Sequence, residues 1–475
     1  MATRTTTKTE EPAAPETPSP LAQTHNSPVA DRIARGKALR ERCPRKAQAE
    51  WKPPAKRADP IDLLIENSRG RIEELVPIRY GRMMANPFAF YRGAAAIMAY
   101  DLSRTPSTGL AVQACGDCHL VNFGGFATAE RQIIFDINDF DETSIAPWEW
   151  DVKRLATSFV VAGRSNGFSA ADCQAAAHQV AQNYRLRLAE YSQKAVLDVW
   201  YDSLDFDQII HNLPDKQMRK FYLKKLEAAA EQSAHEKEFA KLAFASGETP
   251  RIIDQPPLIY HMTGVDEAQQ RANWEASLAD YLRSLPPERR VLLDRYKLSD
   301  AAMKVVGVGS VGTFCGIALL MSGKGDPLFL QIKQARQSVL EPYAGASPFK
   351  HSGQRVVVGQ RLMQAASDMF LGWYSGLGRR HFYVRQLADA KIKPVVEIMK
   401  PQNLKNYAML CGWALARAHA RSGDAAVLTG YLGNSTAFED AIAAFSVAYA
   451  DQNERDHAAL VAAVRAGKVE ARQVE

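Results

Sequence analysis

The stretch Cys115-Gly-Asp-Cys-His-Leu-Val-Asn122 is a polar loop, and the apolar run Gln132-Ile-Ile-Phe-Asp-Ile-Asn138 follows it. Asp117 and Asn122 are five residues apart, and Asp139 stands 17 residues after Asn122, at the end of that run. Phosphoryl transfer needs a carboxylate that positions the acceptor hydroxyl, together with an amide and a second carboxylate that hold Mg²⁺. The loop and the run supply this set of groups, so the pattern indicates a magnesium-dependent phosphotransfer site.

A second stretch, Gly307-Val-Gly-Ser-Val-Gly312, lies between the apolar runs Met303–Val306 and Phe314–Leu320. In dinucleotide-binding folds such glycines open a helix after a strand, whereas here they join two strand-like runs. A glycine loop between two strands has the geometry of a flap over nucleotide phosphates, although an ordinary glycine-rich hairpin has the same pattern. The glycines expected in this flap are Gly307, Gly309 and Gly312.

Lys333 is the cation expected to accompany the glycine loop. It ends the apolar run Leu328-Phe-Leu-Gln-Ile-Lys333, which is predicted to be the next strand. A lysine is costly to bury unless it is paired, so Lys333 either points at phosphates or faces solvent from an edge strand. We expect the first arrangement. Arg92, which precedes the polar loop, could reach phosphates or the acceptor, but we expect it to form an ion pair with Asp139 or Asp141.

Composition and periodicity divide the chain into helical and β-rich parts. Apolar residues recur at three- and four-residue spacing in Trp150–Ala162, Ala170–Tyr191, Pro214–Phe244 and Tyr407–Ala420, which predicts helices. We therefore expect an α+β protein. Its parts would be a disordered tail and basic linker (1–58), a helical catalytic lobe (59–295), a β-rich nucleotide-binding lobe (300–394), the completion of the helical lobe (395–465) and a C-terminal tail (466–475).

Several motifs resemble those of known families. Gly116-Asp-x-His119-x-x-Asn122 resembles the catalytic loop of aminoglycoside and choline phosphotransferases, and Asp139-Phe140-Asp141 resembles their metal-binding step. Pro147-Trp-Glu-Trp-Asp-Val-Lys-Arg-Leu155 resembles the start of the helix whose aspartate braces that loop. The run Phe88–Ser158 is also similar to DUF2252, a bacterial family of unknown function, and this similarity extends over about residues 60–460.

The resemblance implies an ATP- and Mg²⁺-dependent phosphotransferase with a two-lobed protein-kinase-like fold. The catalytic loop precedes the glycine loop here, which is the reverse of the usual order, so the fold would be circularly permuted. A small molecule would be the acceptor. The resemblance implies that Asp117 is the catalytic residue, that His119 braces its loop, and that Asn122 and Asp139 bind the metal. Lys333 and the glycines Gly307, Gly309 and Gly312 would contact the phosphates. Gln386, Leu387 and Ala388 would form a hinge that contacts the adenine.

Two assignments stay open at the level of sequence. The helix expected at Ser352–Met369 contains no glutamate to pair with Lys333, which leaves Glu341 or Asp368 as its partner. Asp136 competes with Asp139 as the metal ligand, although the Asp-Phe-Asp context favours Asp139.

Other functions fit parts of the sequence. A kinase-like fold can serve as an inactive nucleotide-binding scaffold, or can transfer AMP instead of phosphate. Cys115-x-x-Cys118-His119 also matches the attachment motif of c-type haem, and the two cysteines could form a redox pair or half of a zinc site.

The composition excludes several broad classes. The chain has 475 residues with 24% charged residues and a net charge of +6, which gives no support for nucleic-acid binding. Six cysteines do not make a disulfide framework in a chain of this length. We see neither a long apolar run nor a secretory signal, so we expect a cytoplasmic protein that does not bind a membrane.

Overall fold

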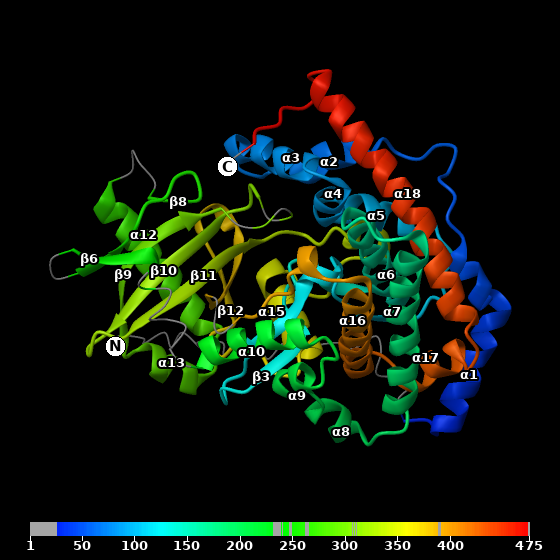
Figure 1. Cartoon of the computed structure of the whole chain (residues 1–475). Coiled ribbons are helices and arrows are strands. Elements are labelled where there is room, and N and C mark those ends of the chain that lie inside the picture. The colour runs from blue at the N-terminus through cyan, green and yellow to red at the C-terminus, as the bar shows by residue number, and fades with distance from the viewer. Residues whose placement is uncertain are drawn as a thin grey trace, which may run out of the picture.

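The computed structural model describes residues 26–230, 239, 241–246, 249–261, 266–305, 307, 309, 311–387 and 391–473. The first 25 residues of the expected tail and the expected hinge residue Ala388 lie outside this part of the chain. The described chain is a mixed α+β protein, with packed helices on one side and an antiparallel sheet on the other (Figure 1). The expected α+β class is therefore confirmed.

Helices from distant parts of the chain form the helical side. At its centre α6 (Trp148–Ser165), α7 (Ala170–Tyr191), α16 (Pro401–Ser422) and α18 (Ala437–Arg465) pack together. Nearly every residue of α6 is buried, as expected of a helix that is covered on all faces. Around them lie α1 (Val29–Arg42), α2 (Pro60–Ser68), α3 (Val76–Met84), α4 (Pro87–Gly93), α5 (Ala95–Leu102), α8 (Val196–Tyr201), α9 (Phe206–His211), α10 (Lys216–Ala230) and α17 (Ala425–Leu432).

The β-rich side is built on a six-stranded antiparallel sheet in the order β12-β13-β11-β10-β9-β8. Its strands are β8 (Ile259–Tyr260), β9 (Tyr296–Lys304), β10 (Cys315–Ser322), β11 (Pro327–Ala335), β12 (Gly372–Ser375) and β13 (His381–Gln386). Apolar residues of α12 (Glu267–Arg283) and α13 (Pro287–Leu293) share a core with strand residues, and α15 (Ser352–Met363) contacts β11, β12 and β13. A short helix, α14 (Glu341–Ala344), and the hairpin of β6 (Ala243–Ser246) and β7 (Thr249–Ile252) complete this side.

Two small sheets position the polar loop between the helices and the large sheet. β1 (Ala111–Ala114) pairs with β4 (Ser144–Pro147), and β2 (Phe123–Ala127) pairs with β3 (Ile133–Ile137), which also pairs with β5 (Leu204–Asp205). β2 and β3 therefore form a hairpin directly after the polar loop. Asn138 N donates to Asn122 O at 2.7 Å, so the loop before β2 and the loop after β3 lie side by side.

The basic segment that we expected to be a linker begins with a helix. α1 packs so closely on α17 that a Cβ on Gly36 would lie 1.9 Å from Val427 O. Arg40 and Arg45 donate to the carbonyls of Tyr431 and Leu432, at 2.9 and 2.7 Å. Because carbonyls at a helix C-terminus lack partners within the helix, the arginines satisfy them. The prediction was therefore wrong for residues 29–49.

The boundary expected between the two sides, at residues 295–300, is also wrong. β8 pairs with β9, and α12 and α13 bury Tyr281, Leu285 and Leu293 against the sheet. Of the helix expected over Pro214–Phe244, α10 covers Lys216–Ala230, residues 231–238 lie outside the described part of the chain, and β6 begins at Ala243. Helical periodicity does not reveal whether a helix packs on other helices or on a sheet, so 243–293 was assigned to the helical side.

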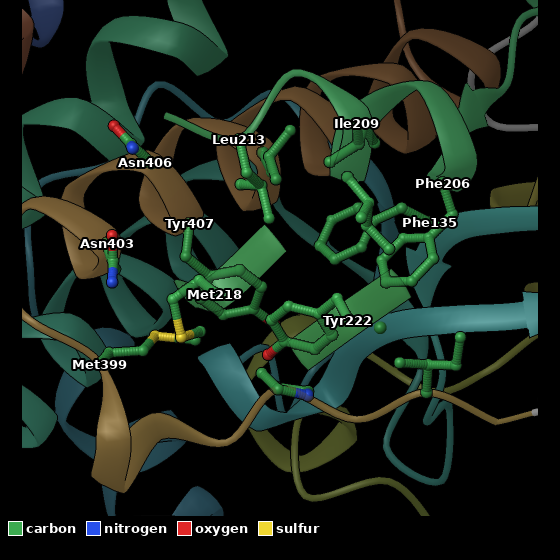
Figure 2. Close-up of a pocket in the computed structure, with 15 residues that line it drawn as sticks. Phe135, Phe206, Ile209, Leu213, Met218, Tyr222, Met399, Asn403, Asn406 and Tyr407 are labelled. Carbon is green, nitrogen blue, oxygen red and sulfur yellow. The ribbon is translucent and has the colours of Figure 1, made fainter. Parts of the chain in front are cut away.

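An apolar pocket lies behind β3, on the far side of the polar loop. Figure 2 shows Phe135 and Phe206 beside Tyr222 and Tyr407; the first two rings stack at 6.2 Å. The pocket has a volume of about 50 Å³ and no charged lining residue. The Tyr407 hydroxyl lies 2.8 Å from Leu120 O and 3.2 Å from Phe123 O, and it can donate to either carbonyl. This apolar layer therefore supports the polar loop from behind.

Within the described part of the chain, no helix is long and apolar enough to cross a membrane.

Candidate functional site

A cleft of about 730 Å³ opens between the large sheet and the hairpin of β2 and β3. A smaller polar cavity of about 140 Å³ adjoins it, and the two share Arg92, Asn122, Asp139 and Gly307 in their walls. Of the residues singled out in the sequence, the structure brings these together around the two cavities: Asp117, His119, Asn122, Asp139, Gly307, Gly309, Lys333, Gln386 and Leu387. The sequence therefore identified one contiguous site from segments that are far apart in the chain.

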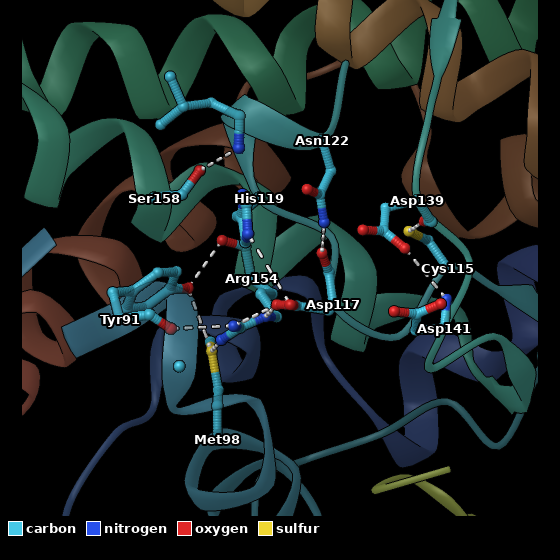
Figure 3. Close-up of polar contacts among 12 residues, drawn as sticks. Tyr91, Met98, Cys115, Asp117, His119, Asn122, Asp139, Asp141, Arg154 and Ser158 are labelled. Carbon is cyan, nitrogen blue, oxygen red and sulfur yellow. Dashed lines mark hydrogen bonds and ion pairs between the residues drawn. The ribbon is translucent and has the colours of Figure 1, made fainter. Parts of the chain in front are cut away.

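Asp117 is held by a buried arginine. Arg154 of α6 donates through Nε to Asp117 Oδ1 at 2.8 Å, and its Nη2 also contacts that oxygen. The guanidinium stacks over the ring of Tyr91 and donates to Tyr91 O at 3.0 Å (Figure 3). Burial by itself would lower the pKa of Arg154, but Asp117 and Tyr91 outweigh it and raise the pKa above its ordinary value. Asp117 is consequently fixed through one oxygen, and its Oδ2 remains available.

A second aspartate fixes the backbone of the loop. Asp151 Oδ2 accepts from Cys115 N at 2.6 Å, and its Oδ1 accepts from Gly116 N at 3.0 Å. Gly116 has a φ of +87°, and a Cβ there would lie 2.3 Å from Glu142 O, so only glycine fits. His419, fully buried, bonds Asp151 through Nε2 at 3.2 Å. The bracing role expected for the aspartate of the 147–155 motif is observed.

His119 lies beneath Asp117 and is 4% exposed. Its Nε2 is 3.8 Å from Asp117 Oδ2, and its Nδ1 has no hydrogen-bond partner among the described residues. Burial lowers the pKa of His119 to about 4; the charges of Arg92 and Arg154 act in the same direction, while that of Asp117 opposes them. His119 is therefore neutral at pH 7, which suits a packing role under the loop.

Asn122 and Asp139 stand next to each other at the floor of the cleft (Figure 3). Asn122 Nδ2 donates to Asp117 O at 2.7 Å, which fixes its amide and leaves Oδ1 as the group that can bind a ligand. Asp139 is 35% exposed at its side chain. Burial by itself would raise its pKa, but Lys333 and Arg385 outweigh it and lower the pKa below its ordinary value. Asp139 therefore presents a charged carboxylate to the cleft.

Lys333 pairs with the loop after β3. Its Nζ donates to Asp141 Oδ2 at 2.7 Å and lies 3.8 Å from Asp139 Oδ1. Neither partner proposed from the sequence is correct. Glu341 lies beside an arginine of α15, at 3.5 Å, and Asp368 accepts hydrogen bonds from the backbone N–H groups of residues 370 and 386. Asp141 was part of the recognised motif, but nothing in the sequence pointed to it as the lysine's partner.

Asp136 does not face the cleft. It is fully buried, and its Oδ2 accepts from Arg417 Nη2 at 2.6 Å and from Ala365 N at 2.9 Å. The bond from Ala365 belongs to the segment after α15, which ends at Met363 and not at Met369 as expected. A tertiary hydrogen bond thus replaces the next helical one. Of the two candidate aspartates, Asp139 is the one that is open to a ligand.

The glycine loop lies directly over Asp117. A Cβ on Gly309 would be 3.8 Å from Asp117 Oδ2. Gly307 and Gly312 have φ angles of +55° and +84°, which favour glycine. Arg71 donates to Gly309 O at 2.9 Å, and Arg82 donates to Gly307 O at 2.7 Å. The helical side therefore holds the loop down onto the site, a contact that the sequence did not indicate.

The expected hinge is only partly supported. Gln386 and Leu387 line the cleft as predicted. Their backbone N–H groups are occupied, because Gln386 N donates to Asp368 and Leu387 N donates to Phe329 O at 3.0 Å. Both N–H groups are therefore engaged within the protein, one by a side chain and one by β11, and adenine contact through other backbone groups of this segment stays a prediction.

The two cysteines of the loop are deeply buried. Cys115 is 1% exposed and Cys118 0%, and both are free thiols. The hydrogen bond from Cys118 favours the Cys115 thiolate, but burial and nearby carboxylates outweigh it and raise the pKa of Cys115 to about 11. Burial raises the pKa of Cys118 as well. Protonated, buried thiols favour a packing role over haem attachment, redox exchange or zinc binding.

One residue of the site, Arg154, was missed in the sequence, and another, Arg92, has a different environment from the one expected. Arg154 lies within the 147–155 motif, yet its pairing with Asp117 has no local signature, since arginines on helices are usually solvated. Arg92 was expected to pair with Asp139 or Asp141, and that prediction is wrong. It makes no hydrogen bond or ion pair with any described residue, and its Nε is buried without a partner.

In the comparison with known proteins, one family model matches most of the chain. Residues 71–463 match the family DUF2252, described as an uncharacterized protein conserved in bacteria. No curated protein and no solved structure matches the sequence. The match includes the polar loop, the glycine loop and Lys333, and it confirms the family resemblance of the 88–158 segment. The chain belongs to the DUF2252 family.

Proposed function

We propose that this protein is an ATP- and Mg²⁺-dependent phosphotransferase with a two-lobed, circularly permuted protein-kinase-like fold. The helical side would be the large lobe, and the sheet with α12, α13 and α15 the small lobe. The reaction would move the γ-phosphoryl group of ATP to a hydroxyl or amine of a small molecule.

The chain order of the small lobe supports this assignment. The glycine loop joins β9 and β10, β11 carries Lys333, and α15 and two strands follow before the chain returns to the helices. Protein kinases arrange their glycine-rich loop and phosphate-binding lysine in this way.

The cleft suits a nucleotide in size and lining. Ligand pockets commonly enclose about 300–1,000 Å³, and this cleft has about 730 Å³. Leu328, Phe370 and Leu387 form an apolar section in which a base can be buried, and Lys333 stands where phosphates would lie. Leu328 and Lys333 are on β11, Leu387 directly follows β13 and Phe370 lies just before β12, so much of this wall belongs to the sheet.

Asn122 Oδ1 and Asp139 are the protein groups that fit a magnesium ion. Among the described residues, no cluster of three or more His, Cys, Asp or Glu side chains is arranged to hold a metal by itself. Mg²⁺ commonly binds proteins through one or two carboxylates and completes its coordination shell with water and substrate phosphates. When bound, Mg²⁺ neutralises charge that develops on the phosphate oxygens.

Asp117 would position the acceptor. Arg154 holds its Oδ1, so Oδ2 is left to accept the hydrogen bond of an acceptor hydroxyl. The acceptor oxygen would form a bond with the γ-phosphorus while the bond from that phosphorus to the β,γ-bridging oxygen breaks. ADP would leave, and the hydroxyl proton would pass to Asp117 Oδ2. His119, neutral at pH 7, would keep the loop packed and would not take this proton.

One observation carries the proposal. Asp117, Asn122, Asp139 and Lys333 border two adjoining cavities beneath a glycine loop, although up to 216 positions of sequence lie between them. These are the residue types that phosphoryl transfer requires, and they come from segments with no local reason to meet.

The test is calorimetric titration of the full chain with ATP, with and without Mg²⁺, for the wild type, Asp139→Ala and Asp198→Ala. Asp198 is an exposed carboxylate on α8, far from the site in sequence, and serves as the matched control. We expect Mg²⁺-dependent binding that weakens at least about tenfold in Asp139→Ala and is unchanged in Asp198→Ala. Absence of binding by the wild type at millimolar ATP would refute the proposal.

Turnover then separates the related functions. ATP labelled at the γ-phosphorus would label the acceptor in phosphotransfer, whereas ATP labelled at the α-phosphorus would label it in AMP transfer. Tight Mg²⁺-dependent binding without labelling, over a broad panel of small hydroxyl and amine compounds, would indicate an inactive nucleotide-binding scaffold.

A further inference from the structure

The smaller cavity beside Asp117 is lined by an unusual number of arginines. They come from the segment after α2, from α3, from α4 and from the end of β11. We call it the arginine pocket, after the residues Arg71, Arg79, Arg92 and Arg336. Its volume of about 140 Å³ is several times the ~30 Å³ share of one water molecule, so it has room for a small charged group. The side chains of Ala95 and Ala96 keep one wall open.

The four guanidinium groups have no carboxylate partner within ion-pair distance in the part of the chain that the structure describes. Three of them donate to neutral groups: Arg71 to Val311 O at 2.6 Å, Arg79 to Gly93 O at 2.9 Å and Arg336 to Asn67 O at 2.9 Å. Burial lowers the pKa of each of the four, and that of Arg79 falls to about 10. Concentrated positive charge without counter-ions is costly, and an anion would relieve that cost.

The carboxylates around the pocket are engaged elsewhere. Asp117 is paired with Arg154, and Asp141 is paired with Lys333. Glu142 accepts from Val339 N at 2.8 Å, and burial raises its pKa. Asp139 is the remaining acidic group in the wall, and it lies toward Lys333 at the boundary with the cleft. The charge of Glu142 favours Arg71, Arg79 and Arg336, and that of Asp117 favours Arg92, but neither carboxylate is at ion-pair distance from any of the four.

Arg92 is the arginine best placed to hold a ligand. It makes no hydrogen bond with any described residue, and its Nε is buried without a partner. Arg79 Nε, on a side chain that is 1% exposed, is also buried without a partner. Arg92 lines both cavities and lies within electrostatic reach of Asp117. Unsatisfied buried donors of this kind mark a place that a polar ligand completes.

We propose that the arginine pocket binds an anionic group, a carboxylate or a phosphate, of the acceptor molecule whose hydroxyl reaches Asp117. The identification of the ligand as the acceptor rests on the proposed phosphotransfer function, whereas the existence of the anion site does not. The pocket lies among residues that follow α2, residues of α3 and α4 and a residue that directly follows β11, close to the reacting group. Planar guanidinium groups recognise both anions by paired hydrogen bonds.

The experiment uses the full chain and inorganic phosphate as the probe. Phosphate is titrated calorimetrically with and without Mg²⁺ and a non-hydrolysable ATP analogue, for the wild type, Arg92→Met, Lys333→Met and Arg283→Met. Arg283 is 81% exposed on α12 and controls for the loss of one positive charge. We expect the wild type to bind phosphate in the presence of the analogue, Arg92→Met to bind it at least about tenfold more weakly, and Arg283→Met to match the wild type.

Folding is checked by thermal unfolding. Arg92 holds no other residue in place, so we expect Arg92→Met to melt no lower than the wild type, and Arg92→Lys to recover part of the phosphate affinity. A variant that melts normally and still binds phosphate like the wild type would overturn the proposal.

The other arms distinguish the sources of the anion. Phosphate that is displaced by the analogue and lost in Lys333→Met would be occupying the nucleotide site, which would overturn the proposal. Phosphate binding that depends on Arg92 in a protein that binds no nucleotide would keep the anion site and remove its role for an acceptor, since the proposed function would then have failed. No phosphate binding at millimolar concentration would overturn both parts of the inference.

Discussion

The Nζ atom of Lys333 lies 2.7 Å from Oδ2 of Asp141, a residue 192 positions earlier in the chain. Burial by itself would lower the pKa of Lys333, but the carboxylates of Asp139 and Asp141 outweigh it and raise the pKa well above its ordinary value. The hydroxyl of Tyr383 also donates to Asp141. Lys333 is therefore charged and held at the mouth of the loop after β3 before any nucleotide binds, which links the large sheet to the site.

The first prediction tests this ion pair. Lys333→Met should lower the free energy of unfolding by about 2 kcal/mol, between the values for exposed and for buried pairs, because Asp141 is 28% exposed. Adding Asp141→Asn should recover part of that loss, since the carboxylate then no longer lacks its partner. Urea denaturation of the two single variants and the double variant measures the coupling. Strictly additive effects would show that the two side chains do not interact in solution.

The second prediction concerns Asp117. Asp117→Asn should reduce turnover by about 10²–10⁴-fold and leave Mg²⁺-dependent ATP binding within about twofold of the wild type. The amide keeps the shape of the side chain beside Arg154, whereas alanine would leave that buried guanidinium unpaired and destabilise the loop. Acceptor labelling and calorimetry on the same preparation check both parts. Undiminished turnover would remove Asp117 from the reaction.

The third prediction concerns the buried pair of Asp136 and Arg417, both fully inaccessible and joined at 2.6 Å. Either Asp136→Asn or Arg417→Met should lower the free energy of unfolding by about 3–5 kcal/mol, because each leaves one buried charge without its partner. Mg²⁺-dependent ATP binding by the folded fraction should persist, since neither side chain lines the cleft. Thermal unfolding followed by nucleotide titration measures the two effects. Loss of Mg²⁺-dependent ATP binding in a fully folded Asp136→Asn variant would indicate that Asp136 is a metal ligand after all.

The fourth prediction concerns pH. The pKa of His119 in the folded protein is about 4, below the value of about 6.5 for a free histidine. Because the folded state binds this proton less readily than the unfolded chain, the stability that neutral His119 contributes is complete above pH 6.5. It is lost as the pH falls toward 4, and this one group should cost about 2 kcal/mol between pH 7 and pH 5.

Variants assign that loss to the residue. Urea unfolding at pH 7 and pH 5 should show a smaller difference for His119→Asn than for the wild type. His211→Asn should behave like the wild type, because His211 is 57% exposed. His351, whose pKa is also lowered to about 4, chiefly by burial, keeps its own contribution in both variants. An unchanged pH dependence in His119→Asn would contradict the assignment.

Much of the site could be predicted because its parts are local. The hairpin 123–139 follows from alternating apolar residues and turn glycines, and Gly116 stands where the backbone needs a positive φ. The glycines at 307–312 and the lysine on β11 were visible for the same reason. The hairpin pairing and the glycine conformations depend on residues a few positions apart, so a single stretch of sequence contains the information.

The wrong predictions all concern long-range contacts. α1 looked like a basic linker until its arginines met the carbonyls of α17, almost 400 positions later. The segment 243–293 was expected in the helical lobe, but apolar residues of its helices α12 and α13 pack on the sheet. Arg92 was expected to form an ion pair, and no described carboxylate pairs with it. In each case the sequence showed whether the side chains were charged or apolar, but it did not show which residues they would contact.

By itself the sequence determined the α+β class, the family and the residue types of the site, because propensity, periodicity and motif spacing act between neighbours. Tertiary structure alone decided that Lys333 pairs with Asp141, that Asp136 is buried against Arg417, and that four arginines without carboxylate partners gather beside Asp117. Charges find such partners only when packing of the apolar core closes the long loops between them, and the free energy for that closure comes from the whole buried surface and not from any one segment.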